Sequence, residues 1–211
     1  MKKSKFIVFE GGEGSGKTTI ANKMKDQLEK EGYEVLYSRE PGGVKIAEEI
    51  RNIILDKNNT ELEKRTEALL FAAARRQHLV EKVIPALNEG KIVICDRFIH
   101  SSLVYQGIAR GIGIEEVYDV NLFAIDDCLP DIVICLDIDP EIGLQRASER
   151  PEENNRIDNE KIEFHKTVNA GYLKIAEYDK SIVVVDASKP KEEVFSEVYK
   201  IIKENIQQKK L

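Results

Sequence analysis

Short apolar runs alternate with stretches of helical periodicity along most of this chain. Four runs have the length and β-branched content of strands: Phe6–Phe9, Ile92–Cys95, Ile132–Leu136 and Ile182–Val185. A weaker fifth run lies at Glu34–Tyr37. Because the runs are continuously apolar rather than alternating, they predict strands that are buried on both faces of a parallel sheet.

Helical patterns fill the intervals between the predicted strands. They cover the ranges 17–31, 44–55, 64–89, 114–127, 140–149, 160–178 and 191–208. Alternation of strands and helices is typical of right-handed βαβ units. The pattern therefore predicts an α/β fold with a doubly wound, five-stranded parallel sheet flanked by helices. The length of 211 residues suits one domain, so we expect residues 1–211 to form a single unit.

Composition excludes several classes of partner. The formal net charge of −6 argues against binding a nucleic-acid polymer, so any anion site must be built locally. No apolar run approaches the roughly 18 residues that span a bilayer, so we expect no membrane association. The first residues lack the apolar segment and cleavage site of a secretory signal, which favours the cytoplasm. Cys95 and Cys135 lie in apolar runs, which predicts buried free thiols, and no cysteine has metal-ligand spacing.

A glycine-rich loop follows the first predicted strand and opens a helix. It matches the pattern G-x-x-x-x-G-K-[ST], which cradles phosphate groups with backbone N–H groups at a helix N-terminus. In this setting Lys17 reaches the β- and γ-phosphates of ATP, and the Thr18 hydroxyl ligates Mg²⁺. The residues expected to bind the nucleotide are Gly11, Gly12, Glu13, Gly14, Ser15, Gly16, Lys17, Thr18 and Thr19.

Charged residues follow the carboxyl ends of the other predicted strands. Arg39 and Glu40 follow the second run, and Asp96 and Arg97 follow the third. Ligands of doubly wound sheets bind beyond this edge. Asp96 has the position from which P-loop enzymes hold Mg²⁺, directly or through water. A surface ion pair is the alternative for one Arg–Asp pair alone.

The chain lacks the N/T-K-x-D and D-x-x-G motifs of GTP switch proteins, which favours a transferase with a second small substrate. Its motifs resemble those of bacterial thymidylate kinases over nearly the whole length. The segments that carry the resemblance are Phe9–Thr19, Arg39–Gly43, Leu70–Arg76, Asp96–Phe98, Ser101–Ser102 and Tyr105–Gly107. Phe98 and His100 depart from the family, which often has tyrosine and an acid there.

The resemblance implies a P-loop kinase fold with a lid at about residues 148–159. It implies transfer of the γ-phosphate of ATP to dTMP, with Mg²⁺, in a homodimer. Arginines should dominate such a site, because the barrier lies in bringing two polyanions together. The expected catalytic residues are Lys17, Arg39, Arg97, Glu13, Arg150 and Arg156.

The resemblance also assigns roles in binding dTMP. Arg39 and Arg97 should grip the acceptor phosphate. Phe71 should stack on thymine, Arg75 should donate to a base carbonyl, and the ring of Tyr105 should crowd the sugar 2′ position. The full set expected to bind this substrate is Glu10, Arg39, Glu40, Pro41, Phe71, Arg75, Arg97, Ser101, Ser102, Tyr105 and Gln106.

Several assignments stay open at this level. The lid contains Arg150 and Arg156, with Arg146 before it, and the pattern does not choose among them. Asp158 and Glu160 could contact Mg²⁺ or pair with arginines. His78 shares the helical stripe of Phe71 and Arg75, and we expect it to be a partly exposed surface residue. A kinase for UMP or CMP, or a regulator that only binds ATP, are the competing functions.

Overall fold

A computed structural model describes residues 4–149 and 155–207 of the chain. Five strands form one sheet: β1 (Lys5–Glu10), β2 (Val35–Arg39), β3 (Ile92–Asp96), β4 (Ile132–Asp137) and β5 (Ile182–Asp186). Their order in the sheet is β2-β3-β1-β4-β5, and every neighbouring pair is parallel. This confirms the predicted doubly wound sheet, with the switch of direction at β1.

The helices lie where the periodicity predicts them, with ends shifted by one or two residues. They are α1 (Lys17–Lys30), α2 (Lys45–Leu55), α3 (Lys64–His78), α4 (Ile84–Asn88), α5 (Ile99–Ser102), α6 (Ile114–Ile125), α7 (Pro140–Ser148), α8 (Ile162–Tyr178) and α9 (Lys191–Gln207). Two segments are π-helical, η1 (Leu79–Val83) and η2 (Leu103–Ala109).

The predicted helical stretch over 64–89 is confirmed, but it is not α-helical throughout. A π-helical turn at Leu79–Val83 separates α3 from α4. Pro85 lies at the start of α4. Proline has no N–H to donate to the carbonyl four residues earlier, and its ring crowds that carbonyl, so the preceding turn widens.

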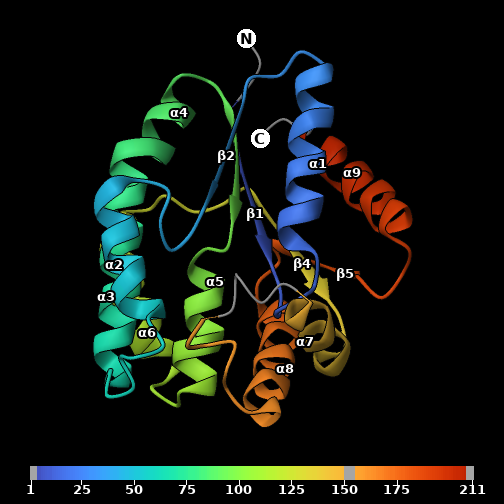
Figure 1. Cartoon of the computed structure of the whole chain (residues 1–211). Coiled ribbons are helices and arrows are strands. Elements are labelled where there is room, and N and C mark those ends of the chain that lie inside the picture. The colour runs from blue at the N-terminus through green and yellow to red at the C-terminus, as the bar shows by residue number, and fades with distance from the viewer. Residues whose placement is uncertain (1–3, 150–154, 208–211) are drawn as a thin grey trace.

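Each strand of the sheet contributes to two separate cores. In β1, Phe6 and Val8 enter one apolar cluster, while Ile7 and Phe9 enter the other. The first cluster also takes apolar side chains of η1, η2 and α8, and the second takes those of α1 and α9. Figure 1 shows α1 and α9 together on one side of the sheet. Because successive side chains point to opposite faces, a strand buried on both faces must be apolar throughout.

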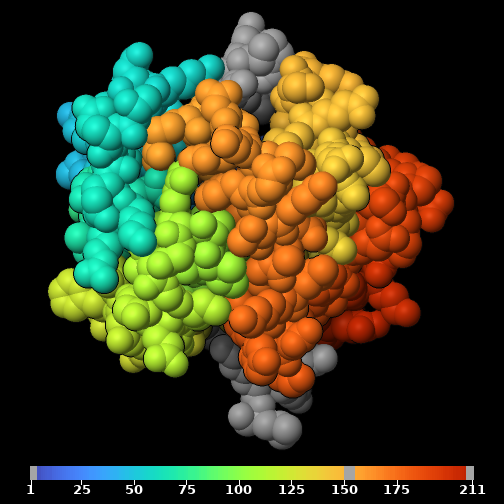
Figure 2. Space-filling model, turned by 90° about the horizontal axis from the view of Figure 1, so that it is seen from below, coloured from blue at the N-terminus to red at the C-terminus, as the bar shows by residue number. Residues whose placement is uncertain are grey.

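Parallel strands bring all their carboxyl ends to one edge. In Figure 1 this is the lower edge, where α5, α7 and α8 gather. Seen from below, α8 and the residues that precede it (orange) lie between α3 (teal) and α7 (yellow) (Figure 2). No helix among the described residues is long and apolar enough to cross a bilayer.

Two adjacent valines of β5 test which face of the sheet each side chain occupies. Val185 is fully buried, whereas Val184 is 39% exposed. We expect Val185→Ala to lower the free energy of unfolding by about 2 kcal/mol, because it removes two buried methyl groups and leaves a cavity. Val184→Ala should lower it by less than about 0.5 kcal/mol. Urea denaturation measures both, and equal losses would contradict the assigned faces.

Candidate active site

The glycine-rich loop joins β1 to α1 and packs closely against α7. Gly16 precedes α1 with a φ of 88°, and Gly14 has a φ of 66°, a region that side chains other than glycine rarely adopt. A Cβ atom on Gly14 would also clash with the backbone of Gly143 in α7. The loop therefore presents the N-terminus of α1 to the site, where unpaired backbone N–H groups bind anions.

Lys17, the first residue of α1, is buried and only 7% exposed. Its Nζ atom donates hydrogen bonds to the carbonyl oxygens of Gly11 (3.0 Å) and Gly12 (2.7 Å) and to Ser15 Oγ (3.3 Å). Burial, followed by the charge of Arg97, lowers the pKa of the Lys17 ammonium. The ammonium therefore lies within the loop, ready to exchange these neutral acceptors for phosphate oxygens.

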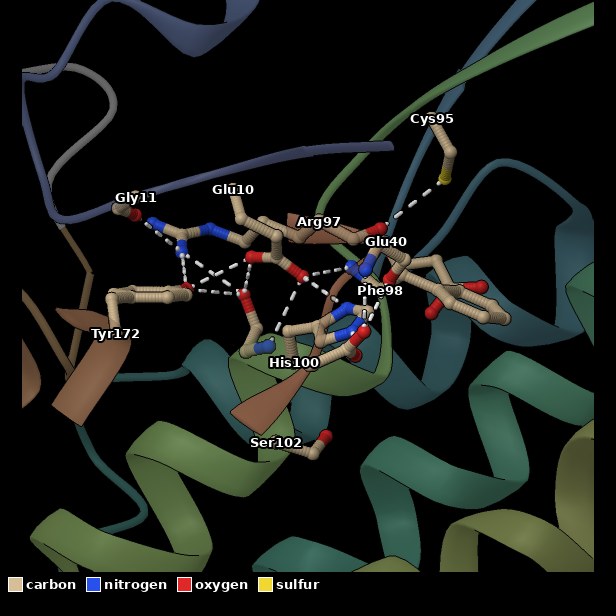
Figure 3. Close-up of polar contacts among 12 residues, drawn as sticks. Glu10, Gly11, Glu40, Cys95, Arg97, Phe98, His100, Ser102 and Tyr172 are labelled. Atoms are coloured by element: carbon tan, nitrogen blue, oxygen red, sulfur yellow. Dashed lines mark hydrogen bonds and ion pairs between the residues drawn. The ribbon is translucent and has the colours of Figure 1, made fainter. Parts of the chain in front are cut away.

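Arg97 is fixed by contacts from several elements (Figure 3). Its backbone has a φ of 70°, an uncommon conformation for a residue with a side chain. Its guanidinium donates to Gly11 O (3.1 Å), Ser101 Oγ (3.2 Å) and Tyr172 Oη (3.4 Å), and it forms an ion pair with Glu13 (2.6 Å). The guanidinium is thus oriented before any substrate binds.

The charge of Glu13 depends on this ion pair. Burial acts to raise the pKa of the Glu13 carboxyl, but the charges of Arg97 and Lys17 outweigh it and the pKa falls to about 2. For Arg97, burial acts to lower the pKa, and Glu13 reverses the effect so that the pKa is raised. Both groups are therefore charged near neutral pH, next to the phosphate loop.

Glu10 is completely buried beneath Arg97 and α5 (Figure 3). Its carboxylate accepts hydrogen bonds from the backbone N–H groups of Phe98 (2.8 Å) and Ser101 (3.1 Å). It also accepts from Ser101 Oγ (2.6 Å) and Tyr172 Oη (2.9 Å), the two hydroxyls that contact Arg97. In this arrangement Glu10 holds the partners of Arg97, and its contact with a substrate stays a prediction.

Thr18 and Asp96 lie together, as the motif predicts. The Thr18 hydroxyl donates to Asp96 Oδ2 at 2.6 Å. A hydroxyl and a carboxylate are hard oxygen donors of the kind that Mg²⁺ prefers. They lie at the carboxyl end of β3, beside the phosphate loop. The donor set therefore fits a magnesium ion.

Arg39 lies at the end of β2 and is joined by a second arginine, Arg51 of α2. Both donate to the carbonyl oxygen of Pro41, Arg39 at 2.9 Å and Arg51 at 3.0 Å. Arg39 also pairs with Glu48 at 3.1 Å. Burial, and then the nearby charge of Arg39, lowers the pKa of Arg51. Two cations thus converge on the same side of the site.

The prediction that His78 is partly exposed is wrong, because its side chain is fully buried. Its ring contacts Ser38 Oγ through Nε2 (2.7 Å) and Glu40 Oε1 through Nδ1 (2.9 Å). Since the Glu40 carboxylate accepts, Nδ1 carries the proton of that contact. The histidine lies on the inner stripe of α3, where it ties that helix to the end of β2.

Arg75 is also buried in this cluster. Its Nε donates to Glu40 Oε2 at 2.7 Å. One terminal nitrogen donates to Ser102 Oγ (3.1 Å) and to Asn121, and the other donates to Phe98 O (3.1 Å). Of its five N–H groups, one has no acceptor among the described residues. The predicted contact of Arg75 with a base carbonyl would use this group and stays a prediction.

A single cavity of about 1090 Å³ joins these features. Its volume lies at the upper end of the range of about 300–1,000 Å³ that is typical of ligand pockets. The predicted residues that line it are Glu13, Gly14, Ser15, Gly16, Lys17, Thr18, Thr19, Arg39, Glu40, Pro41, Phe71, Arg75, Asp96, Arg97, Ser101, Ser102, Tyr105 and Gln106.

The predicted lid is described only in part, because Arg150 lies outside the described residues. Arg146 lines the cavity. Arg156 instead pairs with the buried Glu67 of α3 and donates to Ile54 O (3.0 Å). Burial, and then the charge of Glu13, raises the pKa of Asp158 to about 6. Glu160 pairs with Arg110 at 2.7 Å.

A family model, related sequences and a solved structure all match this chain to thymidylate kinases. The family model described as thymidylate kinase matches residues 9–198. A thymidylate kinase of a Geobacillus species is 57% identical over 92% of this chain and 93% of its own length. One from Clostridium novyi is 53% identical over 96% and 100%. The crystal structure of thymidylate kinase from Ehrlichia chaffeensis superposes with a TM-score of 0.76 at 34% identity, covering 95% and 99%.

The chain belongs to the thymidylate kinase family. It is therefore a phosphotransferase that acts on dTMP.

Three residues of this thymidylate kinase site were missed by sequence reasoning. Arg51 and Tyr172 lie on helices whose patterns explain them as ordinary surface and core positions. Glu67 is 1% exposed and lies one helical turn before Phe71, on the same stripe of α3, which was a usable signal. Arg51 also gave a signal, since α2 starts a few residues after the Arg39 loop and must lie near it.

The contact of α7 with the phosphate loop generates a test. A Cβ atom on Gly143 would clash with the carbonyl oxygen of Glu13. We expect Gly143→Ala to displace the loop and to raise KM for ATP about 10-fold, since the loop's N–H groups lose alignment with the phosphates. Ile142→Ala, at the exposed neighbouring position, should leave KM unchanged. Steady-state kinetics of both variants decides, and an unaltered KM in Gly143→Ala would show that the loop tolerates the added methyl group.

Proposed function

We propose that this chain transfers the γ-phosphate of ATP to the phosphate of dTMP by in-line displacement, with the residues assigned below. The observation that carries the assignment is the shared cavity. One continuous space is lined by the phosphate loop at one end and by Arg39, Phe71 and Gln106 at the other. Two nucleotides placed in it meet phosphate to phosphate at Lys17 and Arg97.

The donor side binds ATP through the loop. Backbone N–H groups at the start of α1 and the Lys17 ammonium replace water around the β- and γ-phosphates. Thr18 and Asp96 would hold Mg²⁺, which when bound would supply positive charge at these phosphates. Since the donors are already in place, little reorganisation accompanies the transfer.

The acceptor side holds the phosphate of dTMP. Arg97 is the fixed cation, and Arg39 with Arg51 supplies two more from β2 and α2. The guanidinium forks bind phosphate oxygens in pairs and stay charged. The acceptor phosphate is itself largely ionised near neutral pH, so the reaction needs little help from a general base. Catalysis is positioning and charge screening.

The nucleoside of dTMP lies between α3 and η2. Phe71 stacks on thymine, and Arg75 offers its remaining N–H group to a base carbonyl. Ser101, Ser102 and Gln106 present hydroxyls and an amide to the base edge. Tyr105, which donates to Glu13 at 3.0 Å, places its ring beside the sugar and disfavours a 2′-hydroxyl.

A lid arginine completes the charge around the transferring phosphoryl group. The phosphate loop carries Glu13 and no arginine, so the cation comes from elsewhere. Arg156 is bound to Glu67 and to α2 in this structure, which favours Arg146 or Arg150 for the role. Comparing kcat for Arg146→Ala, Arg150→Ala and Arg156→Ala identifies it, since removal of the catalytic cation lowers kcat most.

The proposed function is tested with purified protein and ATP-Mg²⁺. We expect dTMP to be phosphorylated with a kcat/KM well above those of UMP and dCMP. Lys17→Ala should lower kcat at least about 100-fold, because it removes a cation from the transferring phosphate. Lys23→Ala, on the same helix but outside the cavity, is the matched control. Faster turnover of UMP or dCMP than of dTMP would overturn the acceptor assignment.

We also propose a homodimer formed through α3 and α6. These helices pack together, and they carry exposed apolar residues. Phe123 of α6 is 91% exposed, and Leu69 of α3 is also exposed. An apolar surface of this kind is typical of a protein interface.

Sedimentation velocity tests the dimer. Phe123→Glu should give a monomer, because a charge at an apolar interface loses its hydration. Tyr178→Glu, on the α8 terminus where the side chain is 77% exposed, should leave the dimer intact. A Phe123→Glu protein that still sediments as a dimer would place the interface elsewhere.

A further inference from the structure

Glu67 is a buried carboxylate with no role in the reaction described above. It lies on α3, one helical turn before Phe71, and is 1% exposed. Its oxygens accept hydrogen bonds from Gln106 Nε2 (2.8 Å), from Arg110 Nε (3.4 Å) and from Arg156. A carboxylate removed from water needs such partners, and two of the three are arginines.

The contact with Gln106 fixes the orientation of that side-chain amide. A carboxylate with these three donors only accepts, so the amide nitrogen is the end that faces Glu67. The amide carbonyl oxygen must then point away from Glu67. Gln106 also lines the nucleotide cavity, and no donor within the described residues contacts its Oε1 atom. Gln106 Oε1 is therefore a hydrogen-bond acceptor for a ligand in the cavity.

Pyrimidine bases differ at the position that such an acceptor distinguishes. Thymine and uracil carry an N–H donor at N3, whereas cytosine carries a lone pair there. An acceptor in the cavity forms a hydrogen bond with the N3–H group of thymine or uracil, whereas the N3 lone pair of cytosine repels it. A reversed amide would present its NH₂ group and would have the opposite preference.

We propose that Glu67 is a specificity-determining positioning residue, which orients the Gln106 amide so that the site selects bases with an N3–H group and rejects cytosine. The proposal rests on the proposed function, in which Gln106 meets the base. Arg110 and Arg156 neutralise Glu67, and Arg156 belongs to the lid, so the residues that read the base are tied to the lid.

The decisive measurement is the ratio of kcat/KM for dTMP to that for dCMP. Glu67→Gln keeps the shape but can bond to Gln106 in either amide orientation. We expect the ratio to fall about 10-fold, the effect of one well-placed hydrogen bond, with KM for ATP unchanged. Arg110→Met removes another partner of Glu67 and leaves the Gln106 contact intact. It should keep the ratio within about 2-fold of the wild-type value, because Arg156 still pairs with Glu67.

A double-mutant cycle separates positioning from a general structural effect. Gln106→Ala should lower the ratio, and adding Glu67→Gln to it should have no further effect, because Glu67 acts only through the amide. The exchanged pair Glu67→Gln with Gln106→Glu should restore preference for dTMP over dCMP. In this pair the amide introduced at position 67 donates to the new carboxylate, whose second oxygen again faces the cavity.

The outcomes distinguish this inference from the proposed function. If the wild-type protein phosphorylates dTMP but Glu67→Gln leaves the ratio unchanged, the inference fails and the function stands. If Gln106→Ala itself leaves the ratio unchanged, the base contact of Gln106 fails, and the inference with it. If the wild-type protein does not phosphorylate dTMP, the function fails.

A measurement on the wild-type protein covers the case in which Glu67→Gln does not fold. The side-chain amide resonances of Gln106 are assigned by their loss in Gln106→Ala. One amide proton should exchange slowly with water because it is bonded to Glu67. Addition of dTMP should change the chemical shifts of the two Gln106 amide protons, and dCMP at equal concentration should not. Fast exchange of both protons would overturn the proposal.

Discussion

Phosphate groups repel one another, so two nucleotides meet end to end only where cations are fixed before either arrives. This protein carries a net charge of −6, yet its cavity is lined with cationic side chains. Each of the arginines described here at its centre is held by an acid or by carbonyl oxygens. Glu13 holds Arg97, Glu40 holds Arg75, and Glu48 holds Arg39. The excess of acids is therefore compatible with an anion site, because some of the acids orient its cations.

The pairs differ in how easily they separate. The side chains of Arg39 and Glu48 are each more than one-third exposed, so their attraction is screened by water and a phosphate can compete with Glu48. Arg75 and Glu40 are almost completely buried, and separating them would leave an uncompensated charge in the core. The first pair suits a residue that binds substrate charge. The second suits a residue that holds one geometry while a base is bound.

The parallel sheet makes this arrangement possible. It brings the ends of β1, β2 and β3 to one edge, so Glu10, Arg39 and Arg97 come together from distant parts of the chain. The apolar strands behind them are buried on both faces and resist displacement. Helices α3 and α8 then add further residues at that edge, including Glu67 and Tyr172. The rigid layers thus position a site that is assembled largely from loops and helix termini.

The sequence by itself determined the sheet, most helix positions, the phosphate loop and the strand-end charges. Each of these depends on local spacing: apolar runs, helical periodicity and a motif whose function lies in its own backbone. Only the tertiary structure decided which side chains contact each other. His78 and Glu67 share the helical stripe of Phe71 and Arg75, but the stripe alone does not show what they contact. The partners of His78, Ser38 and Glu40, come from another strand and the loop after it. The partners of Glu67 and Tyr172 lie 39 or more positions away. Burial and hydrogen bonding at such distances depend on packing between elements, which no local pattern encodes.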